Sequence, residues 1–268
     1  MMTTQTTQLD QQKLRSDEEA NRYSRQSILR SERMYGEGFQ SPGGIEAVEA
    51  FCSKLHMREG MKVLDFGSGL GGATFYFAER YSATVLGLDF SQNMIDISTE
   101  RKERKKLPNV TFRRGDIRTA VLPENTFDLA WTRDCILYIP EKHLVWKNVY
   151  SSLKPGGQLF ITDFCKGNGS LSESFITYLD RCGYHLQDLE SYGQTLEKAG
   201  FHNIRIENHT KAFIDSLQDE LKNLHNDRDQ FLREFSESDF DYLVNRWLKK
   251  IQLCEQGDFL WGLFIAEK

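Results

Sequence analysis

Short apolar runs alternate with amphipathic helical segments along most of the chain. The runs are too short for helices and are rich in β-branched and aromatic residues, which is typical of buried strands. They fall at residues 63–66, 83–88, 110–114, 127–131, 157–163, 203–207 and 259–266. Apolar positions at helical spacing lie between them, at residues 45–55, 73–80, 91–106, 142–153 and 189–199. Strands that alternate with helices predict an α/β fold with a mostly parallel sheet.

Three stretches fall outside this alternation. Residues 1–15 are polar and carry too little apolar surface to order themselves, so we predict a flexible tail. A helical pattern begins at Ser16 and is followed by a glycine-containing segment up to residue 44. Residues of about 210–254 are rich in helix formers and too numerous for a loop, which predicts a helical insertion before the last strand. We expect a single domain over residues 16–268.

A glycine-rich turn follows the first strand, in the stretch KVLDFGSGLGG at residues 62–72. Gly67, Gly69 and Gly72 match the G-x-G-x-x-G spacing of turns that bind dinucleotides. Asp65 argues against a dinucleotide, because its carboxylate would face a pyrophosphate of the same charge. S-adenosylmethionine carries two cations and no phosphate, so Asp65 could hold its ammonium group while the glycines let the backbone approach. An ordinary glycine turn is the alternative for this pattern alone.

Acidic residues also follow the later strands. Asp89 comes about 20 residues after the first glycine, where a carboxylate would bind ribose hydroxyls. Asp116 and Ile117 follow the third strand and suit an adenine amino group and ring. Asp134 follows the fourth strand, and ligands of parallel sheets bind at the carboxyl ends of strands, so we predict that it faces the transferred methyl group. Each acid alone could instead cap a helix or turn.

With these residues the sequence resembles the class I S-adenosylmethionine-dependent methyltransferases. The glycine turn, Asp89, Asp116, Ile117 and the stretch LKPGGQLFITD at residues 153–163 occur in the order typical of that superfamily. A narrower resemblance is to the phosphoethanolamine (phosphobase) methyltransferases, which have segments similar to YGEGFQSPGG, TRDCILYIP, YGQTLEKAGF and WGLFIAEK. The resemblance implies a Rossmann-like class I methyltransferase fold with a seven-stranded, mostly parallel sheet, an N-terminal helical lid at 16–44 and a C-terminal helical cap at about 210–254.

The resemblance also implies site residues. Those expected to bind the cofactor, S-adenosyl-L-methionine, are Ser41, Asp65, Gly67, Gly69, Gly72, Asp89, Phe90, Asp116, Ile117 and Arg133. Those expected around the acceptor nitrogen, as catalytic residues, are Tyr23, Asp134 and Tyr138. Those expected to bind an acceptor phosphate are Phe164, Tyr178, Arg181, Tyr184 and Lys250. The implied activity is direct methyl transfer to a small acceptor, best described as stepwise N-methylation of phosphoethanolamine towards phosphocholine.

Three positions at the acceptor end depart from the phosphobase enzymes. Those enzymes usually carry histidine at the position of Tyr138, arginine at that of Cys182 and tyrosine at that of Phe164. A tyrosine hydroxyl is a poor base near neutral pH, and a lone lysine lacks the forked phosphate contact of arginine. Arg181 is adjacent to Cys182, but one residue turns a helical side chain by about a quarter circle. A non-phosphorylated amine, amino acid or thioether therefore stays open as the acceptor, as does a non-catalytic cofactor-binding protein.

The composition of the chain limits the classes of partner that it could bind. The 268-residue chain has 39% hydrophobic residues and a net charge of −5, which disfavours nucleic acid because phosphate contacts need a basic face. Its 5 cysteines are widely spaced without C-x-x-C pairs, which predicts free thiols in a reducing compartment and no metal site. No apolar run approaches a membrane span, and no signal segment begins the sequence. We expect a cytoplasmic, monomeric enzyme with a small-molecule acceptor.

Overall fold

The computed structural model describes residues 23–268, which contain one seven-stranded sheet of order β3-β2-β1-β4-β5-β7-β6. The strands are β1 (Lys62–Phe66), β2 (Thr84–Asp89), β3 (Val110–Arg114), β4 (Phe127–Arg133), β5 (Leu153–Lys166), β6 (His202–Asn208) and β7 (Phe259–Glu267). β1 pairs in parallel with β2 and β4, whereas β7 is antiparallel to β5 and β6. The mostly parallel sheet is therefore confirmed. The predicted tail at 1–15 and the first part of the predicted lid, 16–22, lie outside the described residues.

Helices connect the strands where the apolar periodicity places them. They are α2 (Arg25–Tyr35), α3 (Gly44–Cys52), α4 (Gly72–Arg80), α5 (Gln92–Lys105), the 3₁₀ helix η1 (Ile136–Tyr138), α6 (Lys142–Ser152), α7 (Glu173–Cys182), α8 (Leu189–Lys198), α9 (Thr210–Asn226), α10 (Arg228–Glu234) and α11 (Glu237–Glu255). The helical pattern expected from Ser16 needs a correction at Tyr23, the first residue of it that the structure describes. Ser24 caps α2 by accepting a hydrogen bond from the amide of Ser27, so Tyr23 lies in a turn before the helix.

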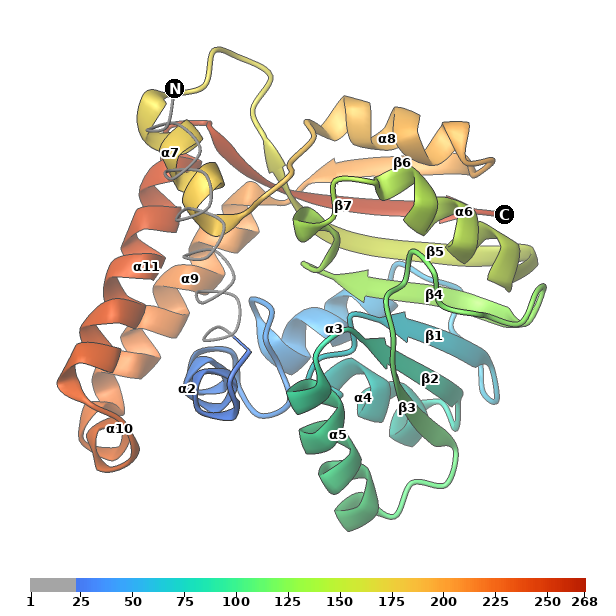
Figure 1. The fold of residues 1–268 in the computed structure, drawn as a ribbon, viewed down its shortest axis with the longest axis horizontal. Helices are drawn as coiled ribbons and strands as arrows, with labels where there is room; N and C mark the ends of the chain where they lie inside the picture. The colour runs from blue at the N-terminus through green and yellow to red at the C-terminus, as the bar shows by residue number, and fades with distance from the viewer. Residues whose placement is uncertain (1–22) are drawn as a thin grey trace, which may run out of the picture.

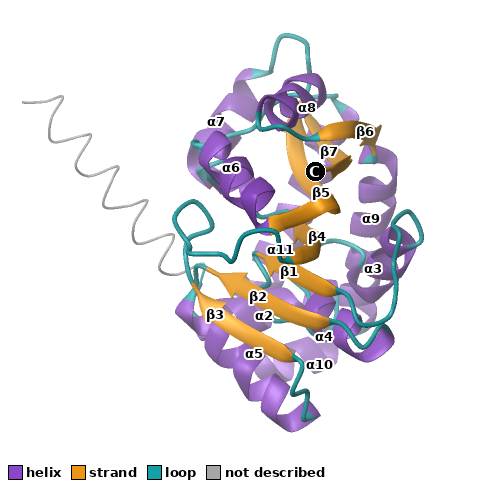
Figure 2. Ribbon diagram, turned by 90° about the vertical axis from the view of Figure 1, so that its right-hand side faces the viewer, coloured by secondary structure: helices purple, strands orange, loops and turns teal. Residues whose placement is uncertain are grey.

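The central strands of the sheet are buried on both faces, and because successive side chains of a strand point to opposite sides, neighbouring residues join different apolar clusters. Val63 of β1 joins an apolar cluster with residues of α3 and α4, such as Phe51 and Phe77. Leu64, the next residue, joins a second cluster that includes Trp146 of α6. Figure 2 shows α6 on one side of the strands and α3 on the other.

The helices α9, α10 and α11 occupy the insertion expected before the last strand. In Figure 1 they gather with α2 and α7 at the left of the sheet. Ion pairs tie α2 to this group: Arg30 contacts Asp239 at the start of α11, and Arg33 lies 3.1 Å from Glu234 of α10. The N-terminal and C-terminal segments therefore meet on the same end of the sheet.

Within residues 23–268, none of the helices has the length and hydropathy needed to span a membrane. No group of histidine, cysteine, aspartate or glutamate side chains in that range could hold a metal ion. The cysteines all have free thiols, and Cys52, Cys165 and Cys254 are buried.

Candidate functional site

A cavity of about 720 Å³ lies at the carboxyl ends of β1, β2 and β4. The neighbouring strands β1 and β4 lead to helices on opposite faces of the sheet, since α4 belongs to one apolar cluster and α6 to the other. Open parallel sheets bind their ligands at such a switch point. The topology therefore supplies the crevice, and the residues after each strand decide what it binds.

The glycine turn after β1 forms the floor of this cavity. Gly67 has a φ of +76°, and a Cβ there would lie 2.4 Å from Sγ of Cys135. A Cβ at Gly72 would lie 2.6 Å from the carbonyl oxygen of Gly38, in the segment after α2. Larger residues at these two positions would collide with neighbouring segments, so glycine keeps the turn tight and its backbone close to a ligand.

Two carboxyl groups face the cavity from the ends of β1 and β2, that of the buried Asp65 and that of the half-buried Asp89. Asp65 accepts a hydrogen bond of 2.6 Å from the Thr74 hydroxyl, and Asp89 accepts bonds from the amides of Gly69 and Ser91 at 2.8 and 2.9 Å. Burial raises the pKa of Asp65 to about 7 and also raises the pKa of Asp89. A cationic ligand in the cavity would stabilise the charged form of these acids.

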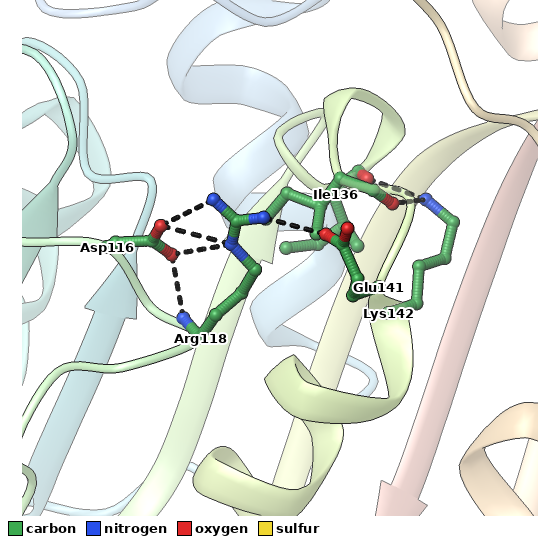
Figure 3. A network of polar contacts seen from close by, with 6 residues as sticks. Asp116, Arg118, Ile136, Glu141 and Lys142 are labelled. Carbon is green, nitrogen blue, oxygen red and sulfur yellow. Dashed lines mark hydrogen bonds and ion pairs between the residues drawn. The ribbon is translucent and has the colours of Figure 1, made fainter.

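A polar network beyond β3 fixes the next part of the wall (Figure 3). Arg118 donates to both carboxylate oxygens of Asp116, with its shortest bond at 2.7 Å, and to Glu141, also at 2.7 Å. The Arg118 guanidinium holds the pKa of the Asp116 carboxyl below its usual range. Lys142, next to Glu141, donates to the carbonyls of Ile136 and Ile139 at 2.6 and 3.1 Å. These bonds hold Asp116 in its charged form and fix both ends of the segment that carries Tyr138.

The two carboxylate oxygens of Asp134 differ in their hydrogen bonding. Its backbone has a left-handed φ of +51°, which is uncommon for a residue other than glycine. Oδ1 accepts a 2.7 Å hydrogen bond from the Trp261 indole of β7. Oδ2 is buried and accepts no well-formed hydrogen bond from the described residues, although the Thr162 hydroxyl is close enough to lower the pKa. Burial outweighs that effect and raises the pKa of Asp134. Because Oδ2 lacks a well-formed bond among the described residues, it could accept an N–H from a ligand.

An aromatic group with a buried lysine stands beside Asp134. The ring centroid of Tyr184 lies 5.3 Å from that of Tyr138 and 5.9 Å from that of Tyr178. Nζ of Lys250 lies 5.2 Å from the ring of Phe164 and 4.9 Å from that of Trp247. Burial and the neighbouring Arg246 lower the pKa of Lys250 to about 7. Tyr138 of this group and the neighbouring Arg246 line the cavity. The aromatic group therefore forms the wall at one end of the cavity.

Comparison with known proteins identifies the family. Residues 57–228 match the family model described as a methyltransferase domain. The chain is also 34% identical over 253 residues to the phosphoethanolamine N-methyltransferase of Plasmodium falciparum, a match that covers 93% of this chain and 94% of that protein. The chain belongs to the phosphoethanolamine N-methyltransferase family.

Relatives from plants and nematodes agree with this assignment. Phosphoethanolamine N-methyltransferase 1 of Zea mays is 43% identical over 246 residues, which are 92% of this chain and 49% of the maize protein, so the chain spans about half the length of the plant relatives. The solved structure of Haemonchus contortus phosphoethanolamine N-methyltransferase 2, in complex with phosphomonomethylethanolamine and S-adenosylhomocysteine, matches with a TM-score of 0.90 at 34% identity, over 92% of this chain and 58% of that one. A sarcosine dimethylglycine methyltransferase structure from Galdieria sulphuraria matches at 22% identity with a TM-score of 0.75, over 84% of this chain and 85% of that one. The Rossmann-like class I methyltransferase fold is confirmed.

In this chain the structure brings the expected cofactor and catalytic residues into one space. Lining the cavity are Tyr23, Ser41, Asp65, Gly67, Gly69, Gly72, Asp89, Phe90, Asp116, Ile117, Arg133, Asp134 and Tyr138. Phe90 is 67% exposed, which leaves its ring free to cover a ligand at the rim. Arg133 is buried and donates to the backbone carbonyls of Pro42 and Gly44, so its guanidinium anchors the segment after α2.

The residues expected to bind phosphate divide into two groups. Phe164, Tyr178, Tyr184 and Lys250 pack together behind the lining. The expected role of Arg181 does not fit the structure, because its side chain is exposed and lies outside the cavity lining. The side chain one residue later, that of Cys182, is half-buried and packs against the aromatic group. The quarter-turn between neighbouring helical residues accounts for this difference.

Sequence reasoning missed several residues of the lining. They include Tyr35, Gln40, Arg118, Trp131, Cys135 and Arg246. For Arg246 a signal was present, because it lies four residues before Lys250 and therefore on the same face of a helix. Gln40, Arg118 and Cys135 lie in loops, and no periodicity in the sequence reports how those loops approach the sheet.

Proposed function

We propose that this methyltransferase uses S-adenosyl-L-methionine to methylate the nitrogen of phosphoethanolamine and of its mono- and dimethyl derivatives. The observation that carries the proposal is one cavity lined by the acids after β1, β2 and β3, by Asp134 and by Tyr138 and Arg246, with the aromatic group and Lys250 packed behind its wall. One end of this cavity suits a cationic adenosyl ligand and the other suits a small amine with an anionic tail. The ligands named for the Haemonchus contortus structure support both assignments.

The cofactor end fits S-adenosyl-L-methionine by charge and by shape. Asp65 would hold the ammonium group, and the turn from Gly67 to Gly72 would let the backbone approach the methionine portion. Asp89 would accept hydrogen bonds from the ribose hydroxyls. Asp116 would accept from the adenine amino group, and Ile117 and Phe90 would cover the ring. Ser41 and Arg133 would act together, since the Ser41 hydroxyl lies 3.4 Å from the Arg133 carbonyl oxygen that it bonds.

The reaction that this geometry supports is an in-line displacement. The bound cofactor supplies an activated methyl group on a sulfonium, so the protein mainly positions the acceptor and keeps its nitrogen unprotonated. Oδ2 of Asp134 would accept an N–H of the acceptor and balance the positive charge that develops on the nitrogen. Tyr138 and Tyr23, which also line the cavity, would orient the amine, and the released proton would pass to solvent. No histidine lines the cavity among the described residues, so Asp134 is the main acceptor of hydrogen bonds there.

Tyr178, Tyr184 and Lys250 would receive the phosphate of the acceptor. Lys250 is 1% exposed and lacks a carboxylate bonded to Nζ among residues 23–268, so a ligand anion would compensate its charge. The pKa of this amine, near 7, would rise when a phosphate binds, because a negative neighbour favours the protonated form.

A turnover assay tests the proposal. Formation of S-adenosylhomocysteine by the full chain is measured with phosphoethanolamine, ethanolamine, glycine, dimethylglycine and methionine as acceptors. We expect phosphoethanolamine to be methylated and Lys250→Met to raise its KM by about 10-fold or more, the size of a lost charged hydrogen bond. Lys249→Met is the matched control, because Lys249 bonds only the exposed Gln252 side chain among the contacts described. Methylation of ethanolamine or glycine in preference to phosphoethanolamine would reject the phosphobase assignment.

A further inference from the structure

Among residues 23–268, Arg246 differs from the other arginines of the cavity in having no anion or carbonyl bound to it. Arg118 binds Asp116 and Glu141, and Arg133 binds two backbone carbonyls. Arg114 donates to the carbonyl oxygen of Phe90 at 3.2 Å. For the Arg246 guanidinium the described residues offer no hydrogen bond or ion pair. Its Cζ lies 5.9 Å from the centroid of the Trp247 ring.

The surroundings of Arg246 are phenol groups and a second cation. The tyrosines whose hydroxyls interact electrostatically with it include Tyr35, Tyr178 and Tyr184. Lys250 lies one helical turn further along α11, and the charge of Arg246 contributes to the lowered pKa of that amine. Two cations that face one another in a partly dry site raise the free energy of the site unless an anion joins them. The arrangement therefore favours a ligand with more than one negative charge.

Helix α7 lacks a cation on the side that faces this group. Cys182 is half-buried there and interacts with Tyr178, whereas Arg181 points to solvent. The resemblance to the phosphobase enzymes implies that arginine usually occupies the position of Cys182. In this chain the guanidinium of Arg246 approaches Tyr178 and Tyr184 from α11.

We propose that Arg246 is the residue that binds the acceptor's phosphate in a forked contact, with Lys250 beside it and with the tyrosine hydroxyls completing the site. This inference rests on the proposed function, because it assigns the anion of that acceptor. A guanidinium offers two parallel N–H donors to a phosphate, which a lysine cannot do. Arg246 can therefore make the forked contact that Cys182 cannot make. The departure at Cys182 then marks a relocated contact, not a change of acceptor class.

Calorimetric titration of phosphoethanolamine into the full chain saturated with S-adenosylhomocysteine tests the inference. We expect Arg246→Gln to weaken phosphoethanolamine binding by about 10- to 100-fold and to leave S-adenosylhomocysteine affinity unchanged. Arg246→Lys should recover only part of the loss, because it keeps the charge without the fork. Arg181→Gln, an exposed arginine on the neighbouring helix, is the matched control and should bind as the unsubstituted chain does. In turnover assays the Arg246→Gln effect should appear in KM and not in kcat.

The outcomes separate this inference from the proposed function. Phosphoethanolamine affinity in Arg246→Gln equal to that of Arg181→Gln overturns the role of Arg246, while methylation of phosphoethanolamine by the unsubstituted chain still supports the function. If the unsubstituted chain binds phosphoethanolamine without methylating it, the function fails and the affinities still decide the inference. Absence of binding by the unsubstituted chain overturns both. If a lowered Tm shows that Arg246→Gln does not fold, the phosphoethanolamine affinity of Arg246→Lys is compared with that of Arg181→Gln instead. Equal affinities would again overturn the role of Arg246. Recovery of affinity on adding Cys182→Arg to Arg246→Gln supports a relocated charge.

Discussion

At the residue scale, the two oxygens of Asp134 are held in different environments by elements that are distant in the sequence. The Trp261 indole fixes Oδ1 from β7, while Oδ2 stays buried without a well-formed bond among residues 23–268. A buried acceptor that lacks a partner costs free energy, which a bound ligand with an N–H group would recover. This difference explains how one carboxylate can be rigid and still available to an acceptor amine.

Substitution of Asp134 by asparagine tests that reading. The amide oxygen can still accept the Trp261 N–H, but the amide nitrogen would then face the acceptor as a donor and repel an ammonium group. We expect kcat to fall by about 100-fold or more, the usual size of a lost acid–base contribution, with little change in cofactor affinity. Steady-state kinetics and calorimetry with S-adenosylhomocysteine measure the two quantities. An undiminished kcat would show that Asp134 does not contact the reacting nitrogen.

At the element scale, Glu220 of α9 joins two segments that close the cavity. Its carboxylate accepts a 3.0 Å hydrogen bond from the amide of Gly43 and a 2.6 Å bond from the Trp247 indole of α11. Burial raises the pKa of Glu220 to about 7, although both bonds oppose the rise. The segment after α2 and the C-terminal helices are therefore coupled through one side chain.

Replacing Glu220 by glutamine should loosen this connection. The glutamine side chain has one carbonyl oxygen for the two N–H donors of Gly43 and Trp247, so one hydrogen bond is lost. Its NH₂ group would then face the other N–H donor. We expect the free energy of unfolding to fall by about 1 to 3 kcal/mol, and the amide of Gly43 to exchange hydrogen faster. Urea unfolding and hydrogen exchange measure these effects, with Asp219→Asn as the control at the neighbouring exposed position. Exchange at Gly43 that matches the control would contradict the coupling.

The strands and the residues at their ends could be predicted from the sequence, because local apolar patterns determine the strands and the parallel topology brings their ends together. The runs at 63–66 and 110–114 became strands within a residue or two of the expected bounds, and Asp89 and Asp134 met in one cavity because parallel strands end at one edge. The strand expected at 157–163 is longer, since antiparallel pairing with β7 extends β5 to Lys166. The four-residue spacing places Arg246 on the same face of α11 as Lys250, but only the docking of α11 brings Arg246 to the cavity, and no sequence pattern reports that docking.

At the scale of the whole molecule, buried acids tie the folding equilibrium to pH. Asp163 of β5 is fully buried, and it accepts hydrogen bonds from the amide of Leu137 at 3.2 Å and from the hydroxyl of Tyr192 at 3.0 Å. Burial raises the pKa of Asp163 to about 7, and the charge of Lys142 only partly offsets that effect. The folded chain therefore keeps a proton at this site that the unfolded chain releases near the ordinary aspartate pKa of 3.8.

The sign of the resulting pH dependence follows from this difference. Between about pH 4 and pH 7 the folded state binds more protons than the unfolded state, so the contribution of Asp163 is fully present below pH 4 and is lost as the pH rises through 7. Asp163→Asn should remove this contribution, because an amide does not titrate in this range and its oxygen can still accept from the amide of Leu137. We expect the difference in unfolding free energy between the unsubstituted chain and Asp163→Asn to fall by about 1 kcal/mol per pH unit from pH 5 to pH 7. Urea titrations at each pH measure it, and Asp180→Asn, an exposed position on α7, should give a difference that does not vary with pH. A difference for Asp163→Asn that is equally flat would mean that Asp163 is charged in the folded protein and that the proton is bound elsewhere.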